Sequence, residues 1–284
     1  MDSPRISVVV TTFDAPDMLH LTLLALGRQA LPPAEVLVAD DGSGPATAAA
    51  LVALAGRLPF PLVHVWQPHA GFRAARSRNN AIFRAREEWI AFLDQDTLPH
   101  RDWLAVHAAH LRPDGLNLGH LLPLPETAGP GYTAADVESG RFETLHGAAA
   151  LRVLDRRQRR DAWYAWLRRL GCGIKAKPRL RSCNAALARA ALRRVNGFDE
   201  DYVGWGQEDD DLGRRLYLAG LRPCVLVNRA RVSHLPHPLR RPPDWRAGAN
   251  VARYRQPLRE AACAHGLTQH PHPDVQATPL SATR

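Results

Sequence analysis

The first hundred residues alternate short apolar runs with amphipathic stretches, and this alternation constrains the fold more than any other feature of the chain. Four runs are predicted to be strands, at residues 6–12, 35–40, 61–66 and 89–94. Three of them are almost continuously apolar, as expected for strands that are covered on both faces. The stretches between them, residues 16–29, 45–54 and 73–86, are predicted to be helices. Such a βαβ series predicts an α/β fold with a mainly parallel sheet between helices.

Polar side chains follow three of the predicted strands at the point where each strand ends. They are Thr11, Thr12 and Asp14 after the first strand, Asp40 and Asp41 after the second, and Asp94 and Asp96 after the fourth. Because ligands bind beyond the carboxyl ends of the strands in open α/β sheets, we expect these groups to converge on one crevice. The sequence lacks the patterns G-x-G-x-x-G and G-x-x-x-x-G-K-[ST], so the usual glycine cradles for NAD and ATP are not predicted.

Asp94 and Asp96 are a candidate metal site. Residues two apart on an extended segment face the same side, so both carboxylates can address one divalent cation, directly or through water. A hard cation held by carboxylates is the usual way to neutralise a diphosphate. His234 or His237, which follow a predicted strand near residues 224–227, could complete the site. A solvated loop is the alternative, because a lone D-x-D pattern often occurs by chance.

The segment HAGFRAARSRNNAI, residues 69–82, predicts contacts with phosphate groups. Gly71 permits a close approach of the backbone. Arg73, Arg76 and Arg78 place guanidinium groups near the start of a helix that faces the crevice. Arginine forks match phosphate oxygens, and Asn79 can hydrogen-bond a sugar or a base. For at least one of the arginines, the alternative is a solvent-exposed basic helix face.

Four consecutive carboxylates, from Glu208 to Asp211, open a predicted helix in a chain whose formal net charge is +9. Acids in the first turn of a helix are stabilised by its dipole. The pairs Asp210/Arg214 and Asp211/Arg215 also have the i,i+4 spacing of helical ion pairs. A helix start therefore explains the last two acids of the run.

The first two acids of the run need another explanation. Glu208 and Asp209 precede Leu212 by four and three residues, so they share the apolar face of the helix. We expect both carboxylates to point toward the protein body. An inward carboxylate needs a charged partner, a hydrogen-bonding partner or a substrate.

The composition is that of a globular protein. The chain has 284 residues, of which 45% are hydrophobic and 23% charged, enough for one domain of two lobes. No apolar stretch reaches the roughly 18 residues of a membrane span, and no signal peptide is recognisable, so we expect a cytoplasmic protein. The four cysteines lack C-x-x-C spacing, which favours reduced thiols. The basic excess predicts an anionic partner, which could be a nucleotide, a nucleic acid or a lipid headgroup.

The second half is harder to interpret. Glycine, proline and polar residues dominate from residue 111 to residue 147. The stretch from Arg152 to Arg181 then places Trp163 and Trp166 at helical spacing among arginines. We expect a helix that packs these tryptophans on the core, with contact to an anionic membrane surface or an anionic acceptor as the alternative. From residue 239 the chain is rich in proline, arginine and histidine, and we expect a partly disordered tail.

These motifs resemble those of family 2 glycosyltransferases with the GT-A fold. VVVTTFDAP, VLVADDGS, GFRAARSRNNAI and FLDQD are similar to the nucleotide-binding half of that family. Residues 196–216, NGFDEDYVGWGQEDDDLGRRL, are similar to an acceptor-side segment that β-1,4-galactosyltransferases share with chondroitin-polymerase-type enzymes. The resemblance implies an inverting, metal-dependent transfer of sugar from a nucleoside diphosphate sugar, usually UDP-linked. The domain would divide into a donor half at residues 1–110 and an acceptor and catalytic half at 111–238, with the tail at 239–284.

The resemblance also implies roles for individual residues. Asp40 or Asp41 would bind the base, and Asp96 would ligate Mn²⁺ or Mg²⁺ with His234 as a further ligand. Trp205 would close over both substrates, and Asp209 would be the catalytic base, kept ionised by the helix dipole. The other implied donor contacts are Thr11, Thr12, Phe13, Asp14, Gly71, Arg73, Arg76, Arg78, Asn79 and Asp94, and the other acceptor contacts are Gly206, Glu208 and Asp210.

The chain departs from the family pattern in two places. The galactosyltransferase relatives carry glycine where this chain has Gln207, and we find no residue-by-residue correspondence with the family between residues 111 and 195. The acceptor is therefore left open between a glycan, a lipid-linked intermediate and a small molecule. The lack of a membrane anchor favours a bacterial enzyme, for which polysaccharide biosynthesis is one role.

Three other readings compete with this one. A sugar-phosphate nucleotidyltransferase also has an α/β nucleotide lobe, but the chain lacks its glycine- and lysine-bearing N-terminal loop. A nucleic-acid-binding protein would explain the charge and leave the inward acids and FLDQD unexplained, so no nucleic-acid partner is expected. A catalytically silent, sugar-binding relative is the third.

Overall fold

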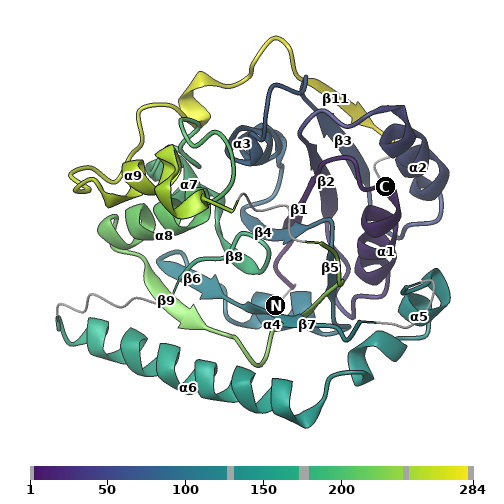
Figure 1. Ribbon diagram of the computed structural model, residues 1–284, viewed down its shortest axis with the longest axis horizontal. Coiled ribbons are helices and arrows are strands. Elements are labelled where there is room, and N and C mark those ends of the chain that lie inside the picture. Colours follow the sequence, from purple (N-terminus) through teal and green to yellow (C-terminus); the bar gives the residue numbers. More distant parts are fainter. Residues whose placement is uncertain (1–2, 127–130, 173–178, 239–242, 281–284) are drawn as a thin grey trace.

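A mixed sheet forms the centre of the molecule (Figure 1). The computed structural model describes residues 3–126, 131–172, 179–238 and 243–280. Within these ranges the main sheet has eight strands in the order β11, β3, β2, β1, β4, β8, β6, β9. Their bounds are β1 Ile6–Thr12, β2 Glu35–Asp40, β3 Leu62–Trp66, β4 Trp89–Asp94, β6 Gly115–Leu118, β8 Ala185–Ala188, β9 Arg222–Val225 and β11 Gln276–Pro279.

The four strands predicted from the apolar runs are parallel neighbours at the centre of this sheet. β1 pairs in parallel with β2 and with β4, and β2 pairs in parallel with β3. The three intervening helices are α1 (Pro16–Gly27), α2 (Pro45–Ala55) and α3 (Ala74–Arg84). Proline opens α1 and α2, where its fixed φ suits a first helical turn. The predicted α/β fold with a mainly parallel core is confirmed.

The core lies in two layers, one on each face of the sheet. Val8 and Val10 of β1 pack with α1 and α2, whereas Val9 packs with α3 on the other face. This alternation follows from the period of two in a strand. The helices α7 (Arg189–Arg194) and α8 (Glu208–Leu218) extend the second layer. Figure 1 shows α1 and α2 on one side of the sheet and α3, α7 and α8 on the other.

A second, three-stranded sheet carries the candidate metal ligand His234 and lies next to Asp96. It has the order β5 (Thr97–Pro99), β10 (Arg231–His234), β7 (His120–Pro123). β10 runs antiparallel to β5, with His234 opposite Thr97. This register brings His234 beside Asp96. The remaining elements of the middle segment are α4 (Trp103–Ala109), α5 (Ala134–Glu138), the 3-10 helix η1 (Arg141–Thr144) and α6 (Ala148–Arg169).

The sequence predicts a partly disordered tail, but residues 243–280 have an ordered structure. They form the 3-10 helices η2 (Trp245–Ala247) and η3 (Leu267–Gln269), the helix α9 (Ala249–Arg255) and β11. β11 adds to the edge of the main sheet, antiparallel to β3. This pairing gives the backbone amides and carbonyls of β11 hydrogen-bonding partners in β3. The amino-acid composition of the tail does not indicate such a pairing. Residues 239–242 and 281–284 lie outside the described residues.

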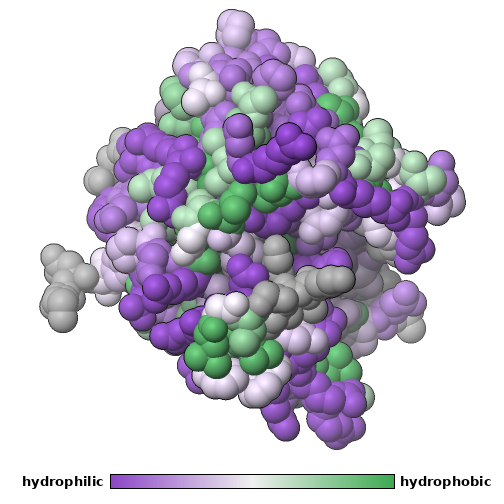
Figure 2. Space-filling view, turned by 90° about the vertical axis from the view of Figure 1, so that its left-hand side faces the viewer, coloured by the Kyte–Doolittle hydropathy of each residue, from purple (hydrophilic) through white to green (hydrophobic). Residues whose placement is uncertain are grey.

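The predicted packing of the α6 tryptophans on the core is wrong. The exposed fraction is 56% for Trp163 and 49% for Trp166. The two rings stack on each other with centroids 5.0 Å apart. The helix instead buries Leu154, Asp161 and Ala165. Figure 2 shows the face of the molecule that carries α8 and α9, which is largely hydrophilic with small apolar patches. In the part of the chain that the structure describes, every helix is too short or too polar to span a bilayer.

Candidate active site

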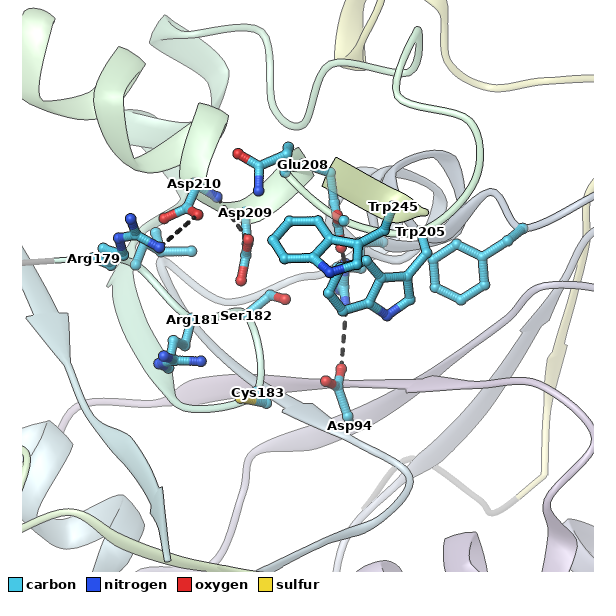
Figure 3. Close-up of a pocket in the computed structure, with 15 residues that line it drawn as sticks. Asp94, Arg179, Arg181, Ser182, Cys183, Trp205, Glu208, Asp209, Asp210 and Trp245 are labelled. Carbon is cyan, nitrogen blue, oxygen red and sulfur yellow. Dashed lines mark hydrogen bonds and ion pairs between the residues drawn. The ribbon is translucent and has the colours of Figure 1, made fainter. Parts of the chain in front are cut away.

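A cleft of about 330 Å³ opens where α8 begins, next to the end of β4 (Figure 3). Its lining is aromatic on one side and acidic on another. The aromatic residues are Phe72, Trp205 and Trp245, the acids are Asp94, Glu208, Asp209 and Asp210, and the cations are Arg78, Arg179 and Arg181. Leu180, Ser182, Cys183, Gly206 and Gln207 complete it. The cleft thus brings together the strand-end acid Asp94 and the acidic helix, as the sequence predicts.

Arg78 joins the two acidic segments. It is buried, and its guanidinium donates to Asp94 Oδ1 at 3.0 Å and to Glu208 Oε1 at 3.0 Å. Its Nε donates to Thr11 Oγ1 at 2.9 Å. Burial alone lowers the pKa of Arg78, but Asp94 and Glu208 outweigh it and raise this pKa above its usual range. Arg78, predicted to bind phosphate, is therefore engaged with protein groups and fixes the positions of Asp94 and Glu208.

The start of α8 has an unusual backbone. Gly204 and Gly206 have φ of +90° and +91°, and Gln207, the N-cap residue, has φ of +77°. A non-glycine residue in this left-handed region is strained by roughly 1 to 2 kcal/mol. A glycine at this position, as the resemblance to galactosyltransferases implies, would adopt the same φ without strain. The Gly204 amide donates to the Phe72 carbonyl at 2.8 Å, which ties the Trp205 loop to the loop before α3.

Asp209 points from the start of α8 into the cleft, toward Ser182 (Figure 3). One carboxylate oxygen accepts from the Asp210 amide at 2.7 Å. No ion pair to Asp209 occurs within the described ranges. Burial, together with Glu208 and Asp210, raises the pKa of Asp209 to about 7. The expectation that the helix dipole keeps Asp209 fully ionised is therefore wrong, because desolvation and two neighbouring carboxylates outweigh the dipole.

The other two acids of the run have basic partners. Asp211 is buried and binds Arg215 at 2.6 Å and Arg214 at 2.8 Å. Asp210 is paired with Arg179 at 3.4 Å. The predicted Asp211/Arg215 pair is confirmed, whereas Arg214 contacts Asp211 in place of Asp210 because the i,i+3 neighbour is nearer.

A candidate metal site lies where β5 begins and β10 ends. Asp96 Oδ2 is 2.9 Å from His237 Nε2 and 3.5 Å from His234 Nε2. The ligand atoms of these three residues all lie within 4.8 Å of one another. Burial alone raises the pKa of Asp96, but hydrogen bonds from both histidines outweigh it and lower this pKa well below its usual range. One carboxylate and two imidazoles suit a divalent transition metal, so the residues fit the implied ion.

Several predicted donor contacts are occupied by protein groups. Asp40 is fully buried and binds His64 Nε2 at 2.7 Å, besides accepting from the backbone amides of residues 42 and 43. Asp41 is also buried, and it accepts from Gln67 Nε2 and from the Arg73 amide at 2.6 Å each. Burial raises the pKa of Asp41, although its hydrogen bonds oppose that shift.

The segment after β3 differs from its prediction in two places. Asn79 lies away from the cleft, because its buried side chain binds Phe198 and Glu200 at 2.8 Å each. Gly71 has φ of +77°, which the turn requires, and no atom lies within 4 Å of the position that a Cβ would take. Arg76 binds Asp274 of the tail at 2.6 Å. The side chains of Arg73 and Arg76 are partly buried.

The end of β1 retains accessible groups. Phe13 is partly buried and stacks on the His69 ring with centroids 4.4 Å apart. Asp14 is exposed, and its Oδ1 accepts from the Gly44 amide at 2.8 Å. Thr12 is buried and donates to Gln95 Oε1 at 2.7 Å. Together these contacts fasten the end of β1 and the loop after it to the loops that follow β2, β3 and β4.

The tail contributes Trp245 to the cleft and Asn250 to the support of the Trp205 loop, and neither is predicted from the sequence. Trp245 lies against Trp205, with ring centroids 5.1 Å apart at an angle of 76°. Asn250 of α9 donates to the carbonyls of Gly206 at 3.0 Å and Gly204 at 3.3 Å. No local pattern marks these residues, because the tail and the Trp205 loop are about 40 positions apart in the chain.

Residues 7–120 match the family described as "Glycosyl transferase family 2", and residues 172–238 match "N-terminal domain of galactosyltransferase". The chain carries a family 2 glycosyltransferase domain. The two matches cover both halves of the cleft. The first match includes the end of β4 and the helix α3, which carries Arg76 and Arg78. The second match includes the helix α8, His234 and His237.

The domain is similar to named enzymes. It is 32% identical over 241 residues to validoxylamine A glucosyltransferase of Streptomyces hygroscopicus subsp. jinggangensis, covering 82% of this chain and 56% of that protein. It is 29% identical over 243 residues to hyaluronan synthase of Pasteurella multocida, covering 76% of this chain and 23% of that protein. The chain thus spans about half of the first relative and a quarter of the second.

A solved mannosyltransferase, PcManGT from Pyrobaculum calidifontis in complex with GDP-Man and Mn²⁺, has a TM-score of 0.55 at 22% identity. That match covers 82% of this chain and 57% of the other. The likeness confirms the predicted GT-A fold.

Proposed function

We propose that this domain is an inverting, metal-dependent glycosyltransferase that moves a sugar from a nucleoside diphosphate sugar to a hydroxyl of an acceptor. The single observation that carries the proposal is Asp209. Its carboxylate faces the cleft, its pKa is raised to about 7, and the aromatic residues and the strand-end acid Asp94 line the same cleft. A general base works best when its pKa is near the operating pH.

In the proposed mechanism, ionised Asp209 accepts the proton of the attacking acceptor hydroxyl. The oxygen then attacks the anomeric carbon from the face opposite the departing diphosphate, which inverts the configuration. Glu208 is held by Arg78 at 3.0 Å and Asp210 by Arg179 at 3.4 Å, so both can orient acceptor hydroxyls. Trp205 and Trp245 cover the sugars and exclude water. Burial raises the pKa of the Cys183 thiol, which keeps it protonated and unsuited to act as a nucleophile.

Asp96, His234 and His237 would hold the metal ion, which neutralises the diphosphate when bound. A set with two imidazoles favours Mn²⁺ over Mg²⁺, because Mg²⁺ prefers oxygen ligands. The mannosyltransferase PcManGT, which shares the fold, was solved with Mn²⁺. Both histidines thus enter the proposed ligand set.

The donor is proposed to be UDP-linked, following the similarity to galactosyltransferases. The accessible groups after β1, Thr11, Phe13 and Asp14, remain its proposed contacts, and Asp41 keeps the base-binding role. Because Asp41 is buried and hydrogen-bonded, that role needs a shift of Gln67 or of the loop that begins at Gly71. Arg73 and Arg76 remain candidates for the diphosphate, since each has a buried guanidinium nitrogen without a hydrogen bond.

The acceptor is proposed to carry an anionic group. A second cleft of about 500 Å³ is lined by Arg157, Arg160, Arg179, Arg181 and Arg214, with Asp161 as its one acidic residue. Arg179 and Arg181 line both clefts. In the proposed complex, the acceptor extends from the catalytic base Asp209 into this arginine-rich cleft. An anionic polysaccharide or a lipid-linked phosphate matches this chemistry.

The exposed stack of Trp163 and Trp166 lies on the same helix as Arg157 and Arg160. It offers a peripheral contact with a membrane on the cytoplasmic side. The helix places aromatic and cationic side chains together, as amphipathic membrane-surface helices do. This contact suits a lipid-linked acceptor.

The test is to incubate the protein and Mn²⁺ with UDP- and GDP-sugars and measure release of the nucleoside diphosphate with and without acceptors. The proposal predicts release that depends on the metal and is stimulated by an acceptor, with a product of inverted anomeric configuration by NMR. Retention of configuration would remove Asp209 from the base role. Formation of a nucleotide sugar from pyrophosphate exchange would instead identify a nucleotidyltransferase.

A further inference from the structure

A second group of metal-ligand side chains lies outside the cleft. Glu200 Oε1 is 2.6 Å from His270 Nε2, and Glu200 Oε2 is 3.2 Å from His272 Nε2. Within the described part of the chain, this group and the Asp96 group are the two sets of three such residues whose ligand atoms gather within 4.8 Å. The catalytic proposal uses the Asp96 group and has no role for the Glu200 group.

We infer that Glu200, His270 and His272 bind a structural Zn²⁺ that fastens the C-terminal segment to the loop preceding Trp205. The donor set is one carboxylate and two imidazoles. Zinc is held by two imidazoles and one carboxylate, with water in the fourth position, at open sites, whereas closed structural sites have four protein ligands, so an ion here would keep a water ligand. The inference does not depend on the proposed function, because none of the three residues lines either cleft.

The geometry requires little movement to accept the ion. Zinc holds nitrogen and oxygen ligands at about 2.0 to 2.2 Å, which places its ligand atoms roughly 3 to 4 Å apart. The Glu200–His272 contact of 3.2 Å already falls in that range, and the Glu200–His270 contact of 2.6 Å needs a small rotation of the carboxylate. The His270 and His272 rings lie with their centroids 4.3 Å apart and are tilted by 68°, and their ligand nitrogens lie within 4.8 Å of each other and of a Glu200 carboxylate oxygen.

The surroundings are built to hold the carboxylate. The side chain of His270 is 0% exposed and that of Glu200 is 11% exposed. Asn79 donates to Glu200 Oε1 at 2.8 Å and is itself fixed by Phe198. Groups that orient a ligand in this way are typical of metal sites. Arg76, whose charge acts on His272, is neutralised by Asp274 at 2.6 Å.

The position of the group indicates what the ion would do. His270 and His272 come from the segment between η3 and β11, and Glu200 lies five residues before Trp205. Backbone bonds already join these segments, since the Glu200 amide donates to the His265 carbonyl at 3.0 Å and the Leu267 amide to the Asn196 carbonyl at 3.0 Å. An ion at this junction would lock the tail, and with it α9 and Asn250, against the Trp205 loop.

The alternative is a hydrogen-bonded cluster without metal, in which each ring donates Nε2–H to the carboxylate. The two arrangements are distinguished by zinc itself. The full-length Asp96→Ala variant removes a ligand of the first site, so tight zinc that remains reports on the second. Zinc content after dialysis, measured by atomic emission, should be about one ion per chain. X-ray absorption should show two imidazole nitrogens and additional oxygen around the ion.

The deciding comparison uses His272, which is 20% exposed and therefore replaceable without emptying the core. Asp96→Ala/His272→Ala should lose the zinc, and Asp96→Ala/His272→Cys should recover it, because a thiolate is a zinc ligand but cannot donate the hydrogen bond that His272 gives to Glu200 in the metal-free cluster. The matched control is Asp96→Ala/His265→Ala, which removes an exposed histidine of the same segment paired with Asp201. That variant should keep its zinc.

Zinc should also raise the melting temperature of the Asp96→Ala protein by about 5 to 10 °C at an ion concentration near 100 times the dissociation constant. Adding zinc to the His272→Ala double variant should leave its melting temperature unchanged. The inference is overturned if the Asp96→Ala protein retains no zinc after dialysis, or if the His272→Ala double variant retains as much as the His265→Ala control.

Discussion

The two acidic segments that meet at the cleft are balanced in different ways. After β4, each acid faces a basic group: Arg78 on Asp94, and His234 and His237 on Asp96. At the start of α8, Asp209 forms an ion pair with none of the basic side chains that the structure describes, and Glu208 and Asp210 flank it. Burial of Asp96 is outweighed by the hydrogen bonds from both histidines, which lower its pKa, whereas burial raises the pKa of Asp94 in spite of Arg78 and, with two neighbouring carboxylates, raises the pKa of Asp209 to about 7.

This difference separates two roles. An acid with a lowered pKa stays ionised and suits cation binding, whereas an acid with a pKa near 7 can take up and release a proton. Arg78 makes the contrast possible because it neutralises Asp94 and Glu208 together and leaves Asp209 to its like-charged neighbours. The predictions below test whether the two segments differ in this way.

The largest effect is expected for Asp209→Asn. Turnover should fall by about 10² to 10⁴, because the amide cannot accept the proton of the acceptor hydroxyl. Binding of the nucleoside diphosphate with Mn²⁺, measured by calorimetry, should be unchanged. Asp210→Asn is the matched control, since its carboxylate is paired with Arg179 at 3.4 Å and should affect acceptor KM more than kcat. Equal losses of turnover in both variants would contradict a special role for Asp209.

The next effect concerns the paired end of the same helix. Arg215→Met should lower the free energy of unfolding by about 3 to 5 kcal/mol, because it leaves a buried carboxylate short of a partner. Arg215 is 2% exposed, binds Asp211 at 2.6 Å and donates to the carbonyls of Val195 and Gly197 at 2.8 Å each.

Urea unfolding monitored by fluorescence measures this change. Arg179→Met is the control, because its contact with Asp210 is longer and its side chain is 70% exposed, so the loss should stay below about 1 kcal/mol. A small effect for Arg215→Met would show that Asp211 is no better balanced than Asp209.

Asp96→Ala should weaken the binding of a nucleoside diphosphate in Mn²⁺ by about 10- to 100-fold or more. Changes to residues that only hydrogen-bond a metal ligand already cost that much, and Asp96 is proposed as a ligand itself. The weaker binding without metal should be unchanged. Calorimetric titrations with and without Mn²⁺ measure both. Asp14→Ala, at an exposed acid after β1, is the control, and its affinity should depend on the metal as in the unmodified protein. If Asp96→Ala binds as tightly in Mn²⁺ as the unmodified protein, the metal assignment is wrong.

Activity and stability should respond to pH in opposite directions at Asp209. The rate should rise as pH increases through about 7, because the ionised carboxylate is the active form. The pKa of Asp209 is higher in the folded state than the roughly 3.9 of an unfolded aspartate, so the native state binds the extra proton and loses stability as pH rises from about 4 to about 7.

Asp209→Asn should therefore be more stable than the unmodified protein at pH 8 and have a flatter dependence of melting temperature on pH. Thermal unfolding between pH 4 and pH 8 gives the comparison. A steeper dependence in the variant would mean that Asp209 is not the carboxylate with the raised pKa.

The smallest effect is expected for Gln207→Gly at the helix start. It relieves a left-handed strain of roughly 1 to 2 kcal/mol, part of which the greater freedom of the unfolded glycine offsets, so a gain of up to about 1 kcal/mol is expected. Gly206→Ala, at φ of +91°, is the control and should lower stability. Thermal unfolding of both variants measures the difference. A loss of stability in Gln207→Gly would refute the strain argument.

The sequence predicts the donor half well for a local reason. Continuous apolar runs and intervening helices identify β1 to β4, and a strand end places its acids at one edge of the sheet. The pattern does not show in which direction each side chain points. Asp40 follows β2 as predicted, but His64 of the neighbouring strand takes its carboxylate into the core. The same limit applies to Asn79, whose partner Phe198 lies 119 residues away.

The acceptor half and the tail depend on contacts between distant segments. Glu200 and His270 are 70 positions apart, and Trp205 and Trp245 are 40 apart, so no spacing rule connects them. The tail is rich in histidine, but this composition indicates neither that the tail is ordered nor which residues its histidines contact. The α6 tryptophans have the periodicity of a core face, but they stack on each other in solvent. Periodicity shows that side chains share a face and does not show what covers it.

The most direct test of the central claim is thermal stability in the presence of UDP, GDP, CDP or dTDP, each with and without Mn²⁺. A ligand at 100 times its dissociation constant adds about 2.7 kcal/mol to the native state, enough for a clear shift in melting temperature. The account predicts that one diphosphate stabilises the protein only with Mn²⁺, and that Asp96→Ala loses this shift. Stabilisation by DNA or anionic vesicles in place of every nucleotide would contradict it.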